Sequence, residues 1–293
     1  MSHTAIDKSA HNTSATLSGL NPEQLAAIKT NSNLGFPVTK SSKSRSFGKI
    51  RYWWSWLVAG TMLLVIALPA LIILYLINRR LWFYPIALWG AENWLAASGI
   101  RVKVSGSEHL DPNRSYVFAS NHRSYLDTAT LFRYAGPRVG IVAKKELLKV
   151  PIMGQGMSFA NVIAIDRSNP ERALASMEKA RSVMEAGYSF GIFVEGTRAM
   201  PGELLPFKKG AFHLAIQTKA PIVPVAIKNT DRLMGKKTGV AYAGTIEMVI
   251  LPPIEIDGRD VDELLYQARL AIARELMASS ASAMAKQQAP GPE

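Results

Sequence analysis

The chain has 293 residues, 48% of them hydrophobic, and carries a net charge of +12 with no cysteine. This length suits one sizeable domain with appended segments, and the missing cysteines exclude disulfide frameworks, zinc–thiolate sites, iron–sulfur clusters and cysteine nucleophiles. The positive charge suits nucleic acid, an anionic membrane surface or an acidic protein partner. It does not choose among them, because residues 1–51 carry +5 and the remainder carries +7.

Residues 1–49 are rich in Ser, Thr, Asn and Lys and show no sustained hydrophobic period. We therefore expect a mostly disordered, basic N-terminal tail, with a short helical turn at residues 22–29. The pattern assigns no function to this tail.

The next segment, from Tyr52 to Asn78, contains no charged residue. About 20 apolar residues are enough to cross a bilayer of roughly 30 Å, so this run predicts a membrane-embedded and interfacial helical segment at residues 50–99. Pro69 lies inside the run, and a re-entrant hairpin therefore competes with a single span. Basic residues flank the run on both sides and leave its orientation open, while the tryptophans around it are typical of a lipid–water boundary.

After residue 100, short β-branched or aliphatic runs alternate with helix-like segments. This alternation predicts an α/β domain at residues 100–279, with a mixed, largely parallel sheet flanked by helices, followed by a flexible tail at residues 280–293. The predicted strands are residues 101–104, 116–120, 139–143, 161–165, 190–195, 222–227 and 246–251. The predicted helices are residues 126–134, 172–186, 210–218 and 261–279.

The segment NHRSYLD, which follows the second predicted strand, sets His122 five residues before Asp127. On one regular helix this spacing turns the two side chains about 140° apart, so they can meet only if His122 lies outside the helix that Asp127 begins. The carboxylate would then accept the imidazole N–H, fix its tautomer and make His122 a general base. The alternative is a surface histidine beside a helix-start aspartate, and this segment alone leaves the choice open.

Basic or glycine-containing groups follow three other predicted strands, and we expect them at the same sheet edge as His122. These groups are Lys144 with Lys145, Arg167, and Glu195 with Gly196, Thr197 and Arg198. Backbone N–H groups at a glycine, beside an arginine fork, suit a phosphate oxygen. Each group taken alone is also consistent with solvated surface charge.

Other catalytic signatures do not occur in the sequence, which has no GxSxG serine elbow, no Walker A loop and no HExxH helix. We therefore predict no metal site and no cofactor. The basic residues beyond the tail are scattered and show no aromatic–basic interleaving. This distribution disfavours the alternative of a membrane-tethered protein that binds nucleic acid or acidic proteins.

Four segments resemble the motif blocks of the glycerolipid acyltransferases. NHRSYLD matches the NHxSxxD block, and FVEGTR with the downstream LLPFKKGAF resembles the FPEGTR…PFKxGAF block of the 1-acyl-glycerol-3-phosphate acyltransferases. NVIAIDR and APIVPVAI resemble the second and fourth blocks in the same order, so the resemblance covers roughly residues 80–255. Val194 and Ala199 replace the usual proline and serine, which bears on the shape of the phosphate-binding turn.

The resemblance implies that His122, oriented by Asp127, removes a proton from a glycerol hydroxyl, which attacks an acyl thioester directly without an acyl-enzyme. The implied phosphate-binding residues are Glu195, Gly196, Thr197 and Arg198, assisted by Arg167 and by Lys144 or Lys145. The expected donor is acyl-CoA or acyl-carrier protein, and the expected acceptor is 1-acyl-glycerol-3-phosphate (lysophosphatidic acid), which yields phosphatidic acid. Glycerol-3-phosphate or another lysolipid is the alternative acceptor. We expect the site at the lipid bilayer, on the cytoplasmic face of a bacterial inner membrane.

Overall fold

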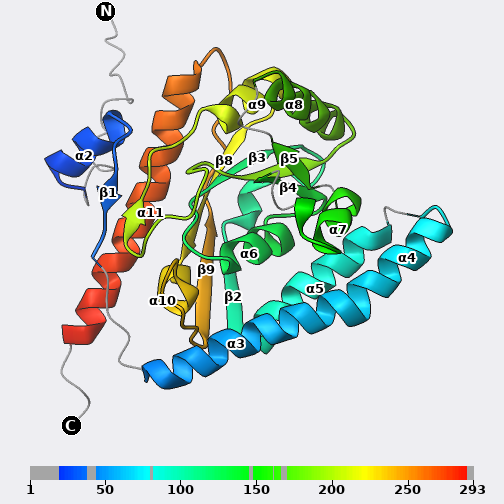
Figure 1. Ribbon diagram of the computed structural model, residues 1–293. Coiled ribbons are helices and arrows are strands. Elements are labelled where there is room, and N and C mark those ends of the chain that lie inside the picture. Colours follow the sequence, from blue (N-terminus) through cyan, green and yellow to red (C-terminus); the bar gives the residue numbers. More distant parts are fainter. Residues whose placement is uncertain are drawn as a thin grey trace, which may run out of the picture.

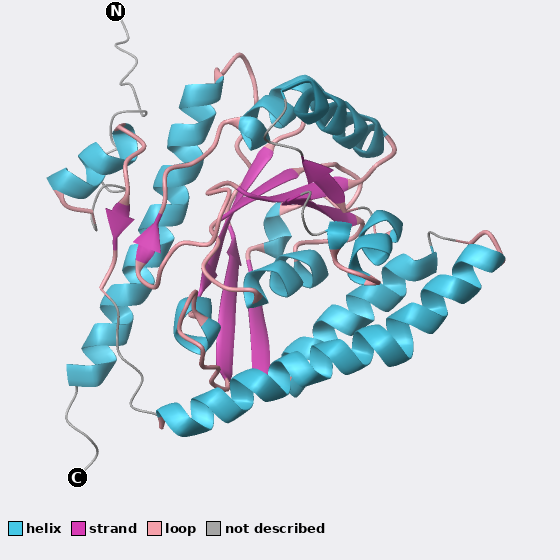
Figure 2. Ribbon diagram, viewed as in Figure 1, coloured by secondary structure: helices cyan, strands magenta, loops and turns pink. Residues whose placement is uncertain are grey.

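The computed structural model describes residues 20–37, 44–79, 82–144, 148–160, 162–165 and 170–288. A seven-stranded sheet lies at the centre, and helices cover both of its faces (Figures 1 and 2). Its strands are β2 (Ile100–Ser105), β3 (Val117–Ser120), β4 (Val139–Lys144), β5 (Ile163–Ile165), β6 (Ser189–Phe193), β8 (Ile222–Lys228) and β9 (Gly244–Ile250). The predicted α/β architecture is confirmed.

The strand order is β2-β9-β8-β3-β6-β4-β5, and every neighbouring pair is parallel except β8 and β9. The central strand β3 places Ser120 opposite Phe193 of β6 and Val225 of β8. Because β3, β6 and β8 run in the same direction, the residues that follow them emerge together at one edge of the sheet.

Four helices of the α/β domain correspond to predicted ones, namely α6 (Leu126–Tyr134), α8 (Pro170–Glu185), α9 (Gly210–Thr218) and α11 (Val261–Gln288). Two short helices, α7 (Met153–Phe159) and α10 (Thr230–Met234), were not predicted. The last helix was expected to end at residue 279 and instead continues to Gln288. Its final turns are rich in Ala, Met, Lys and Gln, which are good helix formers and extend a helix already nucleated on the core.

The apolar N-terminal segment forms one long helix that consists of α3 (Arg45–Met62), a π-helical stretch (Leu63–Ala67) and α4 (Leu68–Leu76). Among the described residues it is the one helix long and apolar enough to cross a membrane, judged by length and composition. Pro69 does not reverse the chain. The wider π turn, in which the Leu68 N–H donates to the Leu63 carbonyl, lets the helix continue past a residue that has no N–H to donate.

The chain reverses after α4 instead, and α5 (Phe83–Ala97) runs back beside the long helix (Figure 1). Buried hydroxyls of Ser55 and Ser98 lie 2.7 Å apart and join α3 to the end of α5, which leads directly into β2. The side chains that are more than half exposed on this helical hairpin include Phe47, Ile50, Trp53, Trp54, Leu57, Leu64, Val65, Ile72, Ile73, Leu76 and Trp82. An exposed apolar surface of this extent is typical of membrane contact.

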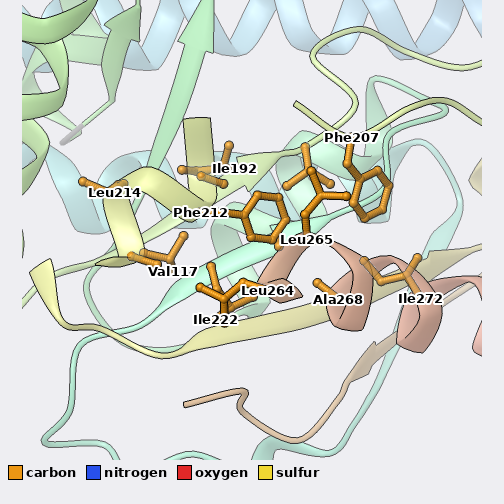
Figure 3. Packing of buried hydrophobic residues seen from close by; sticks show 14 of the residues in the cluster. Val117, Ile192, Phe207, Phe212, Leu214, Ile222, Leu264, Leu265, Ala268 and Ile272 are labelled. Atoms are coloured by element: carbon orange, nitrogen blue, oxygen red, sulfur yellow. The ribbon is translucent and has the colours of Figure 1, made fainter. Parts of the chain in front are cut away.

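Side chains alternate along the central strand, so each face of the sheet has its own core. Val117 and Ala119 of β3 pack into the cluster beneath α9 and α11, whereas Phe118 packs into the cluster beneath α5 and α6. Figure 3 shows Phe212 of α9 and Leu265 of α11 in the first cluster. The sheet is therefore buried on both faces, as its parallel strands require.

Residues 20–37, here called the N-terminal strap, pack against the domain; the helix predicted at residues 22–29 is present, whereas the disorder predicted for the rest of the strap is not observed. The strap contains α2 (Pro22–Lys29) and β1 (Leu34–Gly35), and β1 pairs antiparallel with β7 (Glu203–Leu204). Four of its apolar side chains are buried against the domain, namely Leu20, Ile28, Leu34 and Phe36, and Leu25 and Ala27 are partly buried. This burial is a tertiary gain that a polar local composition does not reveal. Residues 1–19 and 38–43 of the predicted tail lie outside the described residues.

Candidate active site

The loop between β3 and α6 carries the predicted His122–Asp127 pair. His122 follows the last residue of β3 by two positions, and Asp127 is the second residue of α6. His122 Nδ1 lies 3.0 Å from Asp127 Oδ2. His122 therefore lies outside the helix that holds Asp127, as the five-residue spacing requires.

Asp127 is fully buried, and its Oδ2 accepts two further hydrogen bonds from the loop. The Arg123 N–H donates at 2.6 Å and the Ser124 N–H at 2.8 Å. The position in the first turn of α6 also favours a negative charge. A carboxylate held in this way accepts the His122 Nδ1–H and leaves the lone pair of Nε2 for an incoming proton.

The His122 ring is also fixed by packing. It stacks on Phe193, with ring centroids 3.9 Å apart and an angle of 16° between the planes. The His122 side chain keeps 15% of its surface exposed, and no hydrogen bond from a described residue engages Nε2. The imidazole is thus held on one nitrogen and one face, which is the arrangement that a general base needs.

Glu195, expected to contact phosphate, turns its carboxylate inward instead. Oε1 accepts the His122 backbone N–H at 2.6 Å, and Oε2 accepts the Leu205 N–H at 2.7 Å. Burial raises the pKa of Glu195 to about 7, although these two N–H groups oppose the shift. With 2% exposure and both oxygens occupied, this carboxylate joins two loops rather than facing solvent.

The glycine-containing turn after β6 lies beside the His122 loop. The Ala199 N–H donates to the His122 carbonyl at 2.7 Å, so the two motif loops are directly connected. Gly196 takes a left-handed φ of 73°, a conformation that glycine adopts without a Cβ clash. Thr197 is exposed and Arg198 is half-buried, which leaves both side chains near the surface.

The Arg198 guanidinium lies over an aromatic ring of the His122 loop. Its guanidinium carbon is 3.6 Å from the centroid of Tyr125. The Lys236 ammonium donates to the Arg198 carbonyl and holds the backbone of the turn. Neither Tyr125 nor Lys236 was predicted to have a role at the site.

The remaining predicted site residues stay untested. Lys144 ends β4 and its backbone pairs with Ile165 at the end of β5, so both strands end at the same edge. The Lys144 side chain, Lys145 and Arg167 lie outside the described residues. In the part of the chain that the structure describes, no group of three or more His, Asp and Glu side chains is placed to hold a metal ion.

Two further polar residues of the NHRSYLD segment are fully buried and shape the loop. The Asn121 side-chain amide makes two hydrogen bonds with the backbone of Ile227 in β8, at 2.8 and 2.9 Å. The Ser124 hydroxyl donates to the Met234 carbonyl at 2.7 Å. Neither residue was predicted to have a role, although Asn121 and Ser124 occupy the specified N and S positions of the NHxSxxD block.

Arg123 is the third buried residue of this loop without a predicted role. Its Nε donates to the Glu203 carbonyl at 2.8 Å, and its Nη1 lies 3.3 Å from Asp231 Oδ2. The guanidinium carbon also lies 5.3 Å from the centroid of Phe36 in the strap. Arg123 thus connects the His122 loop to β7 and to the N-terminal strap.

This geometry agrees with the comparisons to known proteins. Residues 101–228, which contain both motif loops, match the family model described as Acyltransferase. The 1-acyl-sn-glycerol-3-phosphate acyltransferase of Limnanthes douglasii is 41% identical over 167 residues, which cover 57% of this chain and 59% of that protein. The alpha enzyme of the same name from Homo sapiens is 37% identical over 167 residues, with coverage of 57% and 59%. The resemblance predicted from the four sequence blocks is confirmed.

The sequence matches cover a smaller part of this chain than the structural match does. An uncharacterized acyltransferase of Schizosaccharomyces pombe is 38% identical over 178 residues, which cover 59% of this chain and 64% of that protein. The chain thus spans about three fifths of the length of these relatives. The crystal structure of the 1-acyl-sn-glycerophosphate (LPA) acyltransferase PlsC from Thermotoga maritima has the same fold, with a TM-score of 0.66 and 21% identity. That match covers 83% of this chain and 98% of the other.

Proposed function

We propose that this protein transfers a fatty acyl group from a thioester to the free hydroxyl of 1-acyl-glycerol-3-phosphate, giving phosphatidic acid. The observation that carries the proposal is the 3.0 Å contact of His122 with Asp127. The hydrogen bond from the Ala199 N–H to the His122 carbonyl connects this pair to the turn that bears Arg198. The printed names of the Limnanthes and human relatives support this acceptor.

In the proposed reaction, His122 Nε2 takes the proton of the acceptor hydroxyl while its oxygen attacks the thioester carbonyl carbon. Asp127 stabilises the resulting imidazolium through Nδ1. The tetrahedral intermediate then expels the thiolate, which takes the proton from His122, so no covalent enzyme intermediate forms. The absence of cysteine from the sequence and the absence of a GxSxG elbow agree with direct attack.

The phosphate of the acceptor would bind at the turn of Gly196, Thr197 and Arg198. A guanidinium offers paired N–H donors that match phosphate oxygens, and the exposed Thr197 hydroxyl adds a further donor. Arg167 and Lys144 or Lys145 would assist from the neighbouring strand ends. Glu195 would contribute indirectly, because its carboxylate holds the His122 loop through the His122 backbone N–H.

The donor would be acyl-CoA or acyl-carrier protein, both of which present an acyl thioester next to negative charge. The helical hairpin of α3, α4 and α5 supports membrane association, because it exposes many large apolar side chains. Since the hairpin returns the chain beside α3, the N-terminal strap and the α/β domain lie on one side of the bilayer. We place that side at the cytoplasmic face of a bacterial inner membrane.

The test is a panel of acceptors with purified enzyme in detergent, scored by product mass with either donor. Lysophosphatidic acid should be converted to phosphatidic acid faster than glycerol-3-phosphate or lysophosphatidylcholine is acylated. His122→Ala should lose transfer while it keeps the wild-type melting temperature. His213→Ala, which changes an exposed histidine of α9, is the matched control and should stay active. Transfer by His122→Ala at a near-normal rate would overturn the mechanism.

A further inference from the structure

An aromatic contact connects the Arg198 turn to the membrane hairpin. The Arg198 guanidinium carbon lies 3.6 Å from the centroid of the Tyr125 ring, and Tyr125 also meets Trp56 of α3 edge to face, with ring centroids 5.1 Å apart and an 84° angle. Trp56 in turn lies 6.2 Å from Trp94 of α5. The rings of Tyr125, Trp56 and Trp94 thus form a continuous aromatic contact between the His122 loop and the hairpin.

We propose that Tyr125 is a positioning residue for the acceptor headgroup: supported by Trp56, it orients the Arg198 guanidinium toward the phosphate of a lysolipid that enters from the bilayer. This inference rests on the proposed function and adds to it how the phosphate-binding arginine is set.

Arg198 is held at its backbone and at its guanidinium. Its backbone is fixed by the Lys236 ammonium on its carbonyl and by the neighbouring Ala199 N–H on the His122 carbonyl. Among the ion pairs of the described residues, none includes Arg198. The Tyr125 ring is therefore the contact that sets the direction of the guanidinium.

The contact with Tyr125 places the Arg198 guanidinium over the face of the ring. Stacking on a ring occupies one face of the planar group and leaves its in-plane N–H donors free, whereas a carboxylate partner would occupy those donors. A phosphate needs the in-plane donors. An aromatic support thus fixes Arg198 without competing with the ligand.

Trp56 contacts both the hairpin and the α/β domain. It is half-buried, whereas Trp53 and Trp54 of the same helix are 70% and 52% exposed. Trp56 therefore faces the α/β domain while its neighbours face outward. A lysolipid whose acyl chain lies in the bilayer would present its phosphate at the level of this contact.

The experiment compares Tyr125→Leu with Tyr125→Phe. Leucine removes the ring, so the acceptor KM should rise about 3- to 30-fold, while kcat and the thioester KM stay within about twofold. Phenylalanine keeps the ring face and should restore the wild-type KM. A short-chain lysophosphatidic acid below its micelle concentration should show the same split, which excludes an effect on membrane partition. Tyr125 is 41% exposed, and equal melting temperatures of the variants would confirm the fold.

A double-mutant cycle tests whether Tyr125 acts through Arg198. Arg198→Ala raises the acceptor KM by itself, and adding Tyr125→Leu should raise it by no more than about twofold further, because the supported group is gone. Trp56→Leu should raise the acceptor KM in the same direction, and by more than Trp53→Leu, which removes an exposed tryptophan from the same helix.

An unchanged acceptor KM in Tyr125→Leu, no rescue by Tyr125→Phe, or multiplying effects in the cycle would overturn the inference while the enzyme still acylates lysophosphatidic acid. A wild-type enzyme that acylates no phosphate-bearing acceptor would overturn the proposed function, and this inference with it. Equal effects of Trp56→Leu and Trp53→Leu would overturn the part assigned to the hairpin.

Discussion

The Glu195 carboxylate accepts the backbone N–H of His122 at 2.6 Å, so the loop that carries the candidate base is held by a residue 73 positions later in the chain. The second oxygen of Glu195 holds Leu205. The Leu205 carbonyl in turn accepts from Arg269 of α11 at 2.7 Å, and Arg269 also bonds to Asn31 of the strap. The position of His122 thus depends on elements from both ends of the chain.

The pH dependence of stability should reveal the burial of Glu195. Because burial raises its pKa from 4.5 to about 7, the native state binds a proton between these values that the unfolded state has released. The stabilisation is therefore fully present below the unfolded pKa and is lost as the pH rises through about 7. Glu195→Gln does not titrate, so the melting temperature of the wild type relative to this variant should be higher at about pH 5 than at about pH 8.

Scanning fluorimetry in detergent measures this difference, and Glu108→Gln, which changes an exposed glutamate, serves as the control. Its difference from the wild type should not change with pH. A wild-type advantage that grows toward pH 8 would mean that the two N–H groups outweigh burial.

Asp127→Asn should lower kcat by about 10²- to 10⁴-fold with little change in the acceptor KM, since it removes the charge that stabilises the imidazolium and leaves the phosphate site intact. Steady-state kinetics at saturating thioester measure both parameters. Asp257→Asn removes an exposed carboxylate and should match the wild type. A kcat loss of less than about threefold in Asp127→Asn would show that His122 does not need its partner.

The strap should contribute to stability through Asn31. Its side chain exchanges hydrogen bonds with the backbone N–H and carbonyl of Phe207, at 2.8 and 2.9 Å, and accepts from Arg269 at 3.0 Å. Asn31 has a positive φ of 50°, so glycine preserves the backbone and removes only the side chain. Asn31→Gly should destabilise the protein by about 1–3 kcal/mol, seen as a lower melting temperature.

Asn33→Gly is the matched change at an exposed asparagine of the same strap, and it should cost clearly less. Equal melting temperatures of the two variants would mean that the strap adds nothing through Asn31.

Local patterns were enough to predict most elements of the α/β domain. The predicted helices at residues 126–134 and 210–218 have the observed bounds of α6 and α9, because each has a clear apolar face and a definite stop. The five-residue spacing predicted that His122 and Asp127 could meet only with His122 outside the helix, and the structure has this arrangement. Placing His122 and the turn of Arg198 at one edge followed from the rule that parallel strands end together.

The features that depend on contacts between distant parts of the chain were not predicted. Glu195 was predicted as the last residue of a strand, yet the direction of its side chain depends on the N–H groups of His122 and Leu205, and no local pattern encodes them. The order of the strap depends on contacts with α11 and β7, which lie far along the chain. Pro69 predicted a possible turn, whereas a π-helical stretch just before it accommodates the proline.

The apolar surface of the hairpin should determine membrane binding, and Leu57 and Ile73 offer the sharpest test. Leu57 is 62% and Ile73 56% exposed, on α3 and α4 respectively. Burying such a side chain in lipid is worth about 1.5–3 kcal/mol, so Leu57→Asn with Ile73→Asn should weaken binding to phosphatidylglycerol-containing vesicles by well over tenfold. Vesicle flotation measures the bound fraction. Leu71→Met, a conservative change at a buried position of the same helix, is the control for handling and folding. If both variants float alike, the hairpin surface contributes little and another part of the chain must hold the protein at the bilayer.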